Sequence, residues 1–404
     1  MAALGPAISV LIGAGCSPSS DSQPQPSRSA TPPKENGLRE LAALGYADWD
    51  PIEESAEESR QPRSGVVRAE LDLSAPVRRV WTDDVSTVLS CRPDGSDVRR
   101  TRVPGHRQVE LARPLDGGRV VALSVDEGVT LLDPDGEVLW QVSLPCHHEV
   151  TVAPRAGDTV GTRLLAVALH GEKSFRGRRV RFDSVTFLEE ATGRPTEDPA
   201  WREWSTWSQR TELEALFADR PHPLATRPSN KGDASEGTVY DYFHLNGIAF
   251  DGPATMYLCL RNVSLVARVE LPTGDVSGEV GHGLLDWPHA PSIVQDEDGE
   301  KQLLLFDNGA HRGWSRAVLI DLASGRVAWE WSGSPPRSLW SRVRGSAEML
   351  SNGNVLLTES ERGRILEVTR QGNVAWEFLN PDVVESKDGL RRRRIYRAHA
   401  SASW

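Results

Sequence analysis

Short apolar runs rich in valine and leucine recur along the chain, and turns that contain glycine separate them. Residues 118–124, 301–307 and 353–359 are clear examples. Such runs favour β-strands, and Asp-Gly, Thr-Gly or Ser-Gly pairs supply the positive φ that a tight hairpin turn needs. The pattern therefore predicts an all-β fold built from hairpins.

Six of the turns resemble one another, since most are followed by valine and several by tryptophan. Their glycines are Gly95, Gly136, Gly193, Gly274, Gly325 and Gly372. With the strand signals between these turns, each repeat holds about four short strands, which is the content of one propeller blade. Six repeats predict a six-bladed β-propeller over residues 65–404.

The longest step between repeats runs from Gly193 to Gly274 and predicts an insertion at residues 200–240. This segment begins with three tryptophans at 201–207 and continues with a helical pattern at 210–219. Insertions between blades often lie on one face of a propeller and cover a site. A surface loop without a role is the alternative.

The first sixteen residues form an apolar run that ends in small residues and Cys16. This pattern is typical of a lipoprotein signal peptide, which predicts an exported protein, periplasmic or in the outer membrane, whose only membrane attachment is a lipid on Cys16. Residues 17–64 are rich in polar residues and proline. They are expected to be a low-complexity linker and an N-terminal arm, disordered or loosely docked on the propeller.

Charge and cysteine content exclude several classes of protein. The net charge is −11, from 46 Lys and Arg against 57 Asp and Glu, so nothing in the overall charge favours nucleic acid as a partner. Without Cys16 the chain keeps Cys91, Cys146 and Cys259, an odd set that lacks CxxC spacing. Neither a disulfide framework nor a zinc site is indicated, and whether one pair forms a bridge stays open.

Three histidines occupy matching places in successive repeats. His148, His244 and His289 each come just before an apolar run that is predicted to be the innermost strand of a blade. Because the ends of these strands face the central channel, the three side chains are expected to converge on one funnel. His244 and Asn246 are two residues apart, so strand alternation predicts that both face the channel.

Motifs for other chemistries are absent from the sequence. It has no phosphate-binding GxxxxGK[ST] loop, no HExxH zinc motif and no GxSxG nucleophile elbow. A metal site made by the three histidines stays open, because ligands from separate blades need no local spacing. The run of arginines at 391–394 is predicted to be a solvated edge or a strand that closes the ring.

Several motifs, in this order, resemble the bacterial arylsulfate sulfotransferase family over most of the chain from about residue 65. They are His-His-Glu at 147–149, His-Leu-Asn at 244–246, Cys-Leu-Arg-Asn at 259–262, Asp-Trp-Pro-His at 286–289, Phe-Asp-Asn-Gly-Ala-His-Arg at 306–312 and Ser-Ala-Glu-Met-Leu-Ser-Asn-Gly-Asn at 346–354. The resemblance implies a six-bladed propeller without a cofactor or a nucleotide donor. It also implies transfer of a sulfuryl group from a phenolic sulfate ester to a phenol, by a ping-pong mechanism.

The resemblance also assigns roles to residues. It places the nucleophile, which becomes a covalent sulfohistidine, on His289, and the supporting catalytic roles on His148, His244, Asn246 and Arg261. General chemistry agrees, because a neutral imidazole can attack sulfur and leave again, while preorganised donors stabilise charge on the sulfuryl oxygens. Asn308, Arg312, Trp287 and Tyr242 are ranked below these residues as substrate-binding candidates.

Two features depart from the family pattern. Glu149 stands where aspartate is common, which affects the residues behind the histidines, and the sequence lacks the N-terminal β-sandwich of some members. The second departure predicts a monomer. Two other readings stay open: a non-catalytic binding or scaffold propeller of the lipoprotein kind, and a metal-dependent lyase or hydrolase.

Overall fold

A computed structural model describes residues 64–70, 77–83, 85–155, 157–160, 162–219, 239–386, 389–402 and 404. The predicted signal peptide with Cys16, nearly all of the predicted arm at 17–64 and the part of the predicted insertion from 220 to 238 lie outside these residues.

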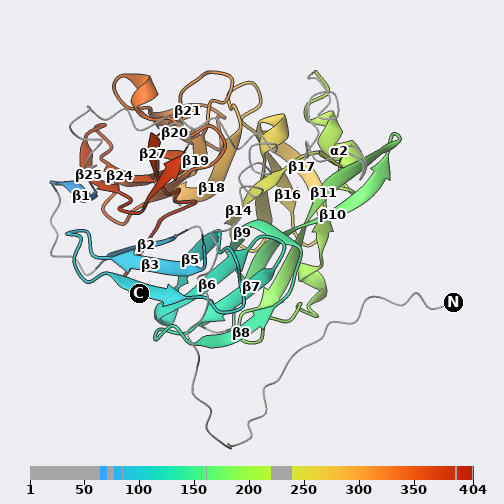
Figure 1. Ribbon diagram of the computed structural model, residues 1–404. Helices are drawn as coiled ribbons and strands as arrows, with labels where there is room; N and C mark the ends of the chain where they lie inside the picture. The colour runs from blue at the N-terminus through green and yellow to red at the C-terminus, as the bar shows by residue number, and fades with distance from the viewer. Residues whose placement is uncertain are drawn as a thin grey trace, which may run out of the picture.

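Six sheets of four or five strands surround a common centre, which confirms the predicted six-bladed propeller (Figure 1). From the innermost strand outward, the first blade contains β28 (His399–Ser401), β2 (Arg78–Thr82), β3 (Thr87–Cys91) and β4 (Arg99–Arg102). The second blade contains β5 (Leu111–Leu115), β6 (Arg119–Ser124), β7 (Gly128–Leu132) and β8 (Val138–Val142). The third contains β9 (Cys146–Ala153), β10 (Leu164–Phe175), β11 (Arg178–Glu189) and β12 (Trp204–Ser205), with β13 (Val239–Asp241) parallel to β11.

The other three blades follow the same plan. The fourth contains β14 (Leu245–Asp251), β15 (Thr255–Leu260), β16 (Leu265–Glu270) and β17 (Asp275–Val280). The fifth contains β18 (Pro288–Gln295), β19 (Lys301–Asp307), β20 (Arg316–Asp321) and β21 (Val327–Trp331). The sixth contains β22 (Ser346–Met349), β23 (Val355–Glu359), β24 (Arg364–Val368), β25 (Val374–Leu379) and, outermost, β1 (Gly65–Ala69).

The remaining elements are short. A separate hairpin consists of β26 (Val383–Ser386) and β27 (Gly389–Arg392). The helical segments are α2 (Arg210–Ala215) and the single 3-10 turns η3 (Asp116–Gly118), η4 (Pro199–Trp201), η6 (Arg261–Val263), η7 (Pro336–Ser338) and η8 (Ser360–Arg362).

The two ends of the chain close the ring. The C-terminal strand β28 pairs with β2 as the innermost strand of the first blade, with Arg78 opposite Ser401. The N-terminal strand β1 pairs with β25 at the outside of the sixth blade, so that blue and red strands lie side by side (Figure 1). The closing strand begins at His399, beyond the arginine run at 391–394, and Arg392 and Arg394 in that run are buried. The prediction of a solvated edge there was wrong.

All six turn glycines occupy the same place in their blades, between the third and the fourth strand. Each has a positive φ, from 67° at Gly193 to 88° at Gly372. At Gly193 a Cβ would also lie 2.6 Å from the ring of Trp140 in the second blade. The repeated turn is therefore both a hairpin and a contact surface between blades.

Tryptophans on outer strands bind the turn of the following blade. The indole nitrogen of Trp140 donates to Glu190 O at 2.8 Å, that of Trp204 to Gly274 O at 2.9 Å, and that of Trp331 to Gly372 O at 2.9 Å. Trp376 of the sixth blade donates to Pro93 O of the first blade at 2.5 Å. The recurring tryptophan of the sequence thus joins successive blades, and we call these four contacts the tryptophan latches.

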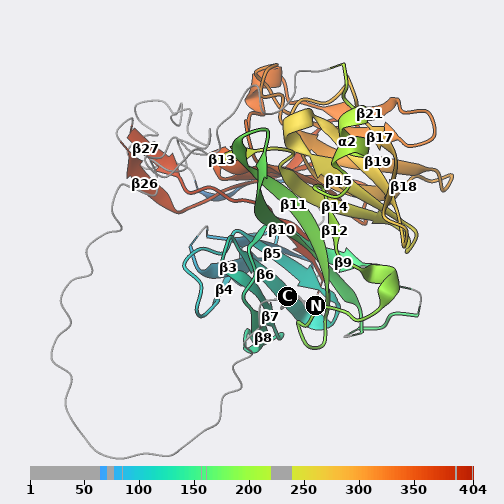
Figure 2. The same ribbon diagram turned by 90° about the vertical axis from the view of Figure 1, so that its right-hand side faces the viewer.

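Part of the segment predicted as an insertion belongs to the third blade. Trp204 and Ser205 form the outer strand β12, and the predicted helix is the shorter α2. Arg210 of α2 lies over the rings of Phe175 and Trp207, beside the long hairpin of β10 and β11 that projects from the third blade (Figures 1 and 2).

Replacing Trp376 by phenylalanine tests the latches. The change removes the buried indole N–H and leaves Pro93 O without its donor, so we expect the free energy of unfolding in urea to fall by about 1–3 kcal/mol. Trp329→Phe is the matched control, because the Trp329 indole donates to Arg370 O at an exposed position. Its expected loss is below about 1 kcal/mol. Equal losses in the two variants would contradict this role for Trp376.

Candidate active site

The backbone turns sharply where the histidines enter the inner strands. His148 in β9 has a φ of 56° and His244, just before β14, a φ of 58°. His289 in β18 lies between Trp287 and Ala290, whose φ values are 59° and 51°. The pairing register of β9, β14 and β18 with its neighbouring strand shifts at these places. Positive φ is uncommon in residues with side chains, and such conformations gather at functional sites.

His148 and His244 lie together. Their ring centroids are 4.8 Å apart, and both side chains are buried. The Nδ1 atom of His148 lies 3.2 Å from Glu110 Oε2, and the Nδ1 atom of His244 makes a short hydrogen bond with Asp241 Oδ2. A hydrogen bond to a carboxylate makes Nδ1 the donor and directs the lone pair of a neutral ring to Nε2. The Nε2 atom of His244 is buried and has no hydrogen-bond partner in the described part of the chain.

The tautomer of His289 follows from its contact with Asn308. The Nδ2 atom of Asn308 donates to Ser341 O at 2.5 Å and to Arg344 O at 2.7 Å. These two carbonyls can only accept, so they place the Asn308 Oδ1 atom toward His289, 2.6 Å from its Nδ1 atom. His289 Nδ1 must therefore carry the proton, and Nε2 of the neutral ring keeps its lone pair.

The positive charge of Arg261 lowers the pKa of His148, His244 and His289. It begins the turn η6, and its backbone N–H donates to His244 O at 3.2 Å. Its guanidinium lies over the ring of Trp287, with Cζ 5.0 Å from the ring centroid, and its Nη2 atom is 4.0 Å from Asp241 Oδ2. Trp287 thus holds the arginine in place.

Burial and positive charge keep two of the histidines neutral. Burial lowers the pKa of His289 well below its ordinary value, and the charge of Arg261 lowers it further. The same two causes lower the pKa of His244. A neutral imidazole is the form that can act as a nucleophile or accept a proton.

Asn246 lies beside the other site residues and connects blades. Its Nδ2 atom donates to Pro288 O, next to His289, at 2.8 Å, and its Oδ1 atom is buried without a partner in the described part of the chain. The alternation rule does not extend from Asn246 to His244, because β14 begins at Leu245 and His244 has a positive φ. One amide proton of Asn246 is therefore used between the fourth and fifth blades.

The first, second and sixth blades add three site residues that the sequence interpretation missed. Glu110, Arg344 and Arg397 lie one or two residues before β5, β22 and β28, close to the strand starts where the histidines lie in their own blades. All three are buried. Arg344 Nη2 lies 3.5 Å from Glu110 Oε1, the carboxylate that also contacts His148. The start of each inner strand was the signal that could have found these three residues, but the sequence interpretation considered only histidines there.

Arg397, two residues before β28, contacts residues of the site. Its Nη1 atom is 2.6 Å from Glu149 Oε2, and its Nη2 atom donates to Asn246 O at 2.6 Å. Arg113 contacts the other carboxylate oxygen of Glu149 at 2.9 Å. Burial opposes ionisation of Glu149, but the charges of the two arginines hold its pKa below the ordinary value. In the described part of the chain, Glu149 therefore pairs with arginines and makes no hydrogen bond to a histidine.

Tyr396 lies in the middle of this group. Its ring stacks on His148, with centroids 5.9 Å apart and planes at 13°. The guanidinium carbons of Arg344 and Arg397 are 5.7 Å and 5.2 Å from its centroid. The buried Tyr396 ring thus packs against residues from three blades.

The lower-ranked candidates have different places. Tyr242 belongs to a buried aromatic cluster with Phe182 and Phe243, and its hydroxyl group donates to Glu214, so the structure does not bring it to the histidines. Arg312 is paired with Asp307 at 3.1 Å and lies over the Trp314 ring. Both side chains have structural partners outside the histidine group.

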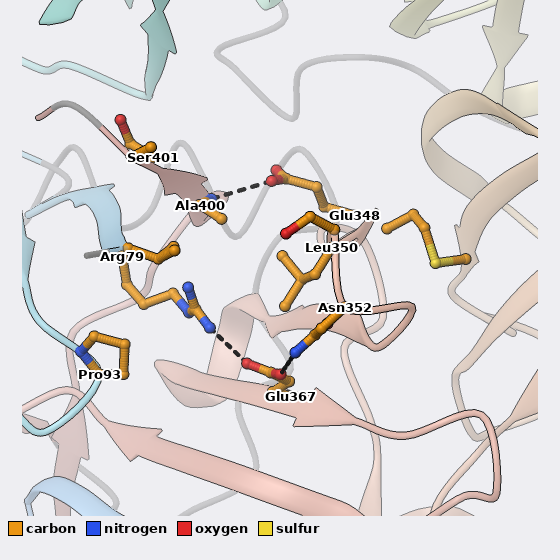
Figure 3. A pocket seen from close by; sticks show the side chains of 12 residues that line it. Arg79, Pro93, Glu348, Leu350, Asn352, Glu367, Ala400 and Ser401 are labelled. Carbon is orange, nitrogen blue, oxygen red and sulfur yellow. Dashed lines mark hydrogen bonds and ion pairs between the residues drawn. The ribbon is translucent and has the colours of Figure 1, made fainter. Parts of the chain in front are cut away.

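A cavity of about 480 Å³ lies at the other end of the inner strands (Figure 3). It is lined by residues at the ends of β22 and β28, among them Leu350 and Ser401. Glu367 in its wall pairs with Arg79 at 2.5 Å and accepts from Asn352 at 2.9 Å (Figure 3). Glu348 accepts from Ala400 N at 3.1 Å (Figure 3). No histidine lines this cavity, so we place the site at the blade entrances instead.

Within the described ranges, no group of three or more His, Cys, Asp or Glu is arranged to hold a metal ion. Cys91, Cys146 and Cys259 are buried free thiols. No helix in the part of the chain with assigned structure is long and apolar enough to cross a bilayer.

Solved structures with similar folds share little sequence with this chain. A protein of unknown function from Bacteroides caccae is 13% identical, with a TM-score of 0.50, over 81% of this chain and 99% of its own. An inactive virginiamycin B lyase from Staphylococcus aureus with quinupristin is 11% identical, with a TM-score of 0.43, over 84% and 96%. BamB from Moraxella catarrhalis is 13% identical, with a TM-score of 0.34, over 80% and 82%. At such low sequence identities, the similarity of these structures to this chain concerns the fold alone. Nothing is concluded from the two structures with TM-scores below 0.5.

No curated protein matches the sequence. The sequence model described as Arylsulfotransferase (ASST) matches residues 112–381, a range that contains His148, His244, Arg261 and His289. This range is well over half of the chain, and the propeller is the fold that the sequence motifs implied. The chain therefore belongs to the arylsulfotransferase family.

Proposed function

We propose that this protein moves a sulfuryl group from a phenolic sulfate ester to a phenolic acceptor through a covalent intermediate on His289. The observation that carries the proposal is the contact between Asn308 Oδ1 and His289 Nδ1, which leaves Nε2 with a free lone pair. Family membership supports arylsulfotransferase activity in general. The ping-pong sequence and the sulfohistidine are our inference from the chemistry of the site.

The first half-reaction forms the S–N bond to His289 Nε2 and breaks the S–O bond of the donor. The electron pair of the S–O bond stays on the phenolate oxygen, which takes up a proton as it leaves. In the second half-reaction, the acceptor phenol loses its proton, its oxygen attacks sulfur, and the S–N bond breaks. Splitting one difficult transfer in this way gives two easier steps.

Charge on the sulfuryl oxygens is met by Arg261. Its charge is the largest one acting on both His244 and His289, so it lies where an anion bound between them would be stabilised. His244 and His148, whose rings are in contact, are the groups that exchange a proton with the phenol oxygen. The buried and unpartnered Nε2 atom of His244 supports this assignment.

A chromogenic aryl sulfate supplied without acceptor tests the covalent step. We expect the wild-type protein to release one equivalent of phenol and to gain the mass of one SO₃ group on His289, as measured by mass spectrometry of its peptides. His289→Ala should show neither result. Tyr242→Phe is the control, because Tyr242 lies in the aromatic cluster, and it should keep the adduct. An adduct on another residue of the wild type would contradict the role of His289.

Asn308→Ala tests how the tautomer of His289 is set. Without the Asn308 carbonyl oxygen, either nitrogen of His289 can carry the proton, and the productive form is no longer selected. We expect kcat to fall by up to about 10⁴-fold, the loss known for a catalytic histidine that is left in the wrong tautomer. KM should change little. An unchanged kcat in a folded variant would show that Asn308 only supports the loop.

The pH dependence of the first half-reaction follows from the lowered pKa of His289. Burial keeps this histidine neutral in the folded protein at pH values where an exposed histidine is already protonated. Stopped-flow phenol release should therefore stay constant between about pH 7.5 and about pH 6, and decline only at lower pH. A loss of rate centred near the ordinary histidine pKa would mean that the nucleophile is exposed to solvent.

A further inference from the structure

Four histidine rings form an unbroken row from the site to the surface. The ring centroids of His244 and His148 are 4.8 Å apart, those of His148 and His147 are 5.1 Å apart, and those of His147 and His170 are 5.1 Å apart. At the outer end, His170 Nε2 lies 2.7 Å from Asp126 Oδ1, and the side chain of Asp126 is 58% exposed. Two of these rings, His147 and His170, have no role in the mechanism above.

The third blade holds the row together. His147 and His148 are neighbours at the start of β9, and β10 pairs with it so that Leu169 lies opposite Cys146. This register brings His170 of β10 beside His147. Asp126 comes from the turn between β6 and β7 of the second blade, and its backbone N–H donates to Cys146 O at 2.9 Å. The row therefore crosses from the inner strand to the gap between two blades.

His147 is surrounded by charges of both signs. Its Nε2 atom is 3.2 Å from Asp183 Oδ1 on β11, and Asp241 on β13 and Arg181 on β11 also act on it. Burial lowers the pKa of His147, but Asp183 and Asp241 together outweigh it and raise the pKa above the ordinary value. In contrast, the pKa of His244 is lowered. A proton is therefore favoured on His147 over His244.

The proposed sulfuryl transfer needs a source of protons close to the site. The side chains of His148, His244 and His289 are all buried. The phenolate that leaves in the first half-reaction has a conjugate acid with a pKa of about 10, so it needs a proton from the protein. The rings of His244 and His289 are neutral before the donor binds, because burial and the charge of Arg261 lower their pKa values.

We propose that His148, His147, His170 and Asp126 form a proton path between the buried site and solvent. The inference rests on the proposed sulfuryl transfer. In the first half-reaction the phenolate oxygen gains a proton from the inner end of the path, and solvent restores it at Asp126. In the second half-reaction the acceptor phenol releases a proton that travels the opposite way. The proton taken up in the first half-reaction equals the proton released in the second, and the sulfuryl transfer needs no other reactant.

Two substitutions interrupt the path at its outer end. His170→Ala removes the ring that joins His147 to Asp126, and Asp126→Asn removes the exposed acceptor of the proton. Among the described residues, neither His170 nor Asp126 forms a hydrogen bond, ion pair or ring contact with His289 or Arg261. His282→Ala is the matched control, since it removes another histidine paired with an aspartate, Asp219, at 3.0 Å.

The measurement is phenol release in a single turnover with two donors. With phenyl sulfate, whose leaving group needs a proton, we expect His170→Ala and Asp126→Asn to be about 10- to 100-fold slower than wild type, up to the lower end of what proton transfer contributes. With 4-nitrophenyl sulfate, whose leaving group departs as an anion, the loss should be below about 2-fold. Imidazole added to His170→Ala should restore the rate with phenyl sulfate. His282→Ala should be unaffected with either donor.

The outcomes separate this proposal from the proposed function. Equal losses with both donors, or no response to imidazole, would show that His170 has only a structural role and would overturn the path. Wild-type rates for both variants with phenyl sulfate would also overturn it. If wild-type protein forms no adduct on His289 with either donor, the proposed function itself fails. An adduct in the wild type together with unaffected variants leaves the function standing and removes the path alone.

Discussion

The pairing of β28 with β2 is the contact on which the rest of the molecule depends. It joins residues 399–401 to residues 78–80 and turns a row of blades into a closed ring. The same short segment carries Tyr396 and Arg397, which contact His148, Glu149 and the Asn246 backbone. Closure of the ring and completion of the site are therefore one structural event. The tryptophan latches act in the same sense, because Trp376 joins the last blade to the first.

Much of the fold was predictable from local signals. The six glycine turns were identified from the sequence because a positive φ restricts the choice of residue, and each does join the third and fourth strands of a blade. The outer strand at Trp204 was assigned to an insertion, since two residues carry too little pattern to indicate a strand. The closing strand at His399 was missed as well, because its partner lies more than three hundred residues away and no local rule reports such a pairing.

In the candidate site, too, some features were predictable from the sequence and others were not. His148 and His244, which were selected at the starts of inner strands, lie in contact, and Arg261, which the family resemblance supplied, is bonded to the His244 backbone. The sequence alone could not predict which side chains donate and which accept hydrogen bonds in the site. Asn308, ranked low because Asp-Asn-Gly is good turn chemistry, is the residue that orients His289, while Tyr242 was ranked with it and lies in an aromatic cluster. Which of two polar residues faces a histidine depends on carbonyl groups from a distant loop, here those of Ser341 and Arg344.

The position of Arg397 beside the closing strand has a consequence for local unfolding. Loss of the β28 pairing would separate Arg397 from Glu149 and leave Arg113 as the cationic partner of this carboxylate. It would also separate the Tyr396 ring from His148. A local opening between the first and sixth blades would therefore disturb the candidate site while the other blades keep their pairing.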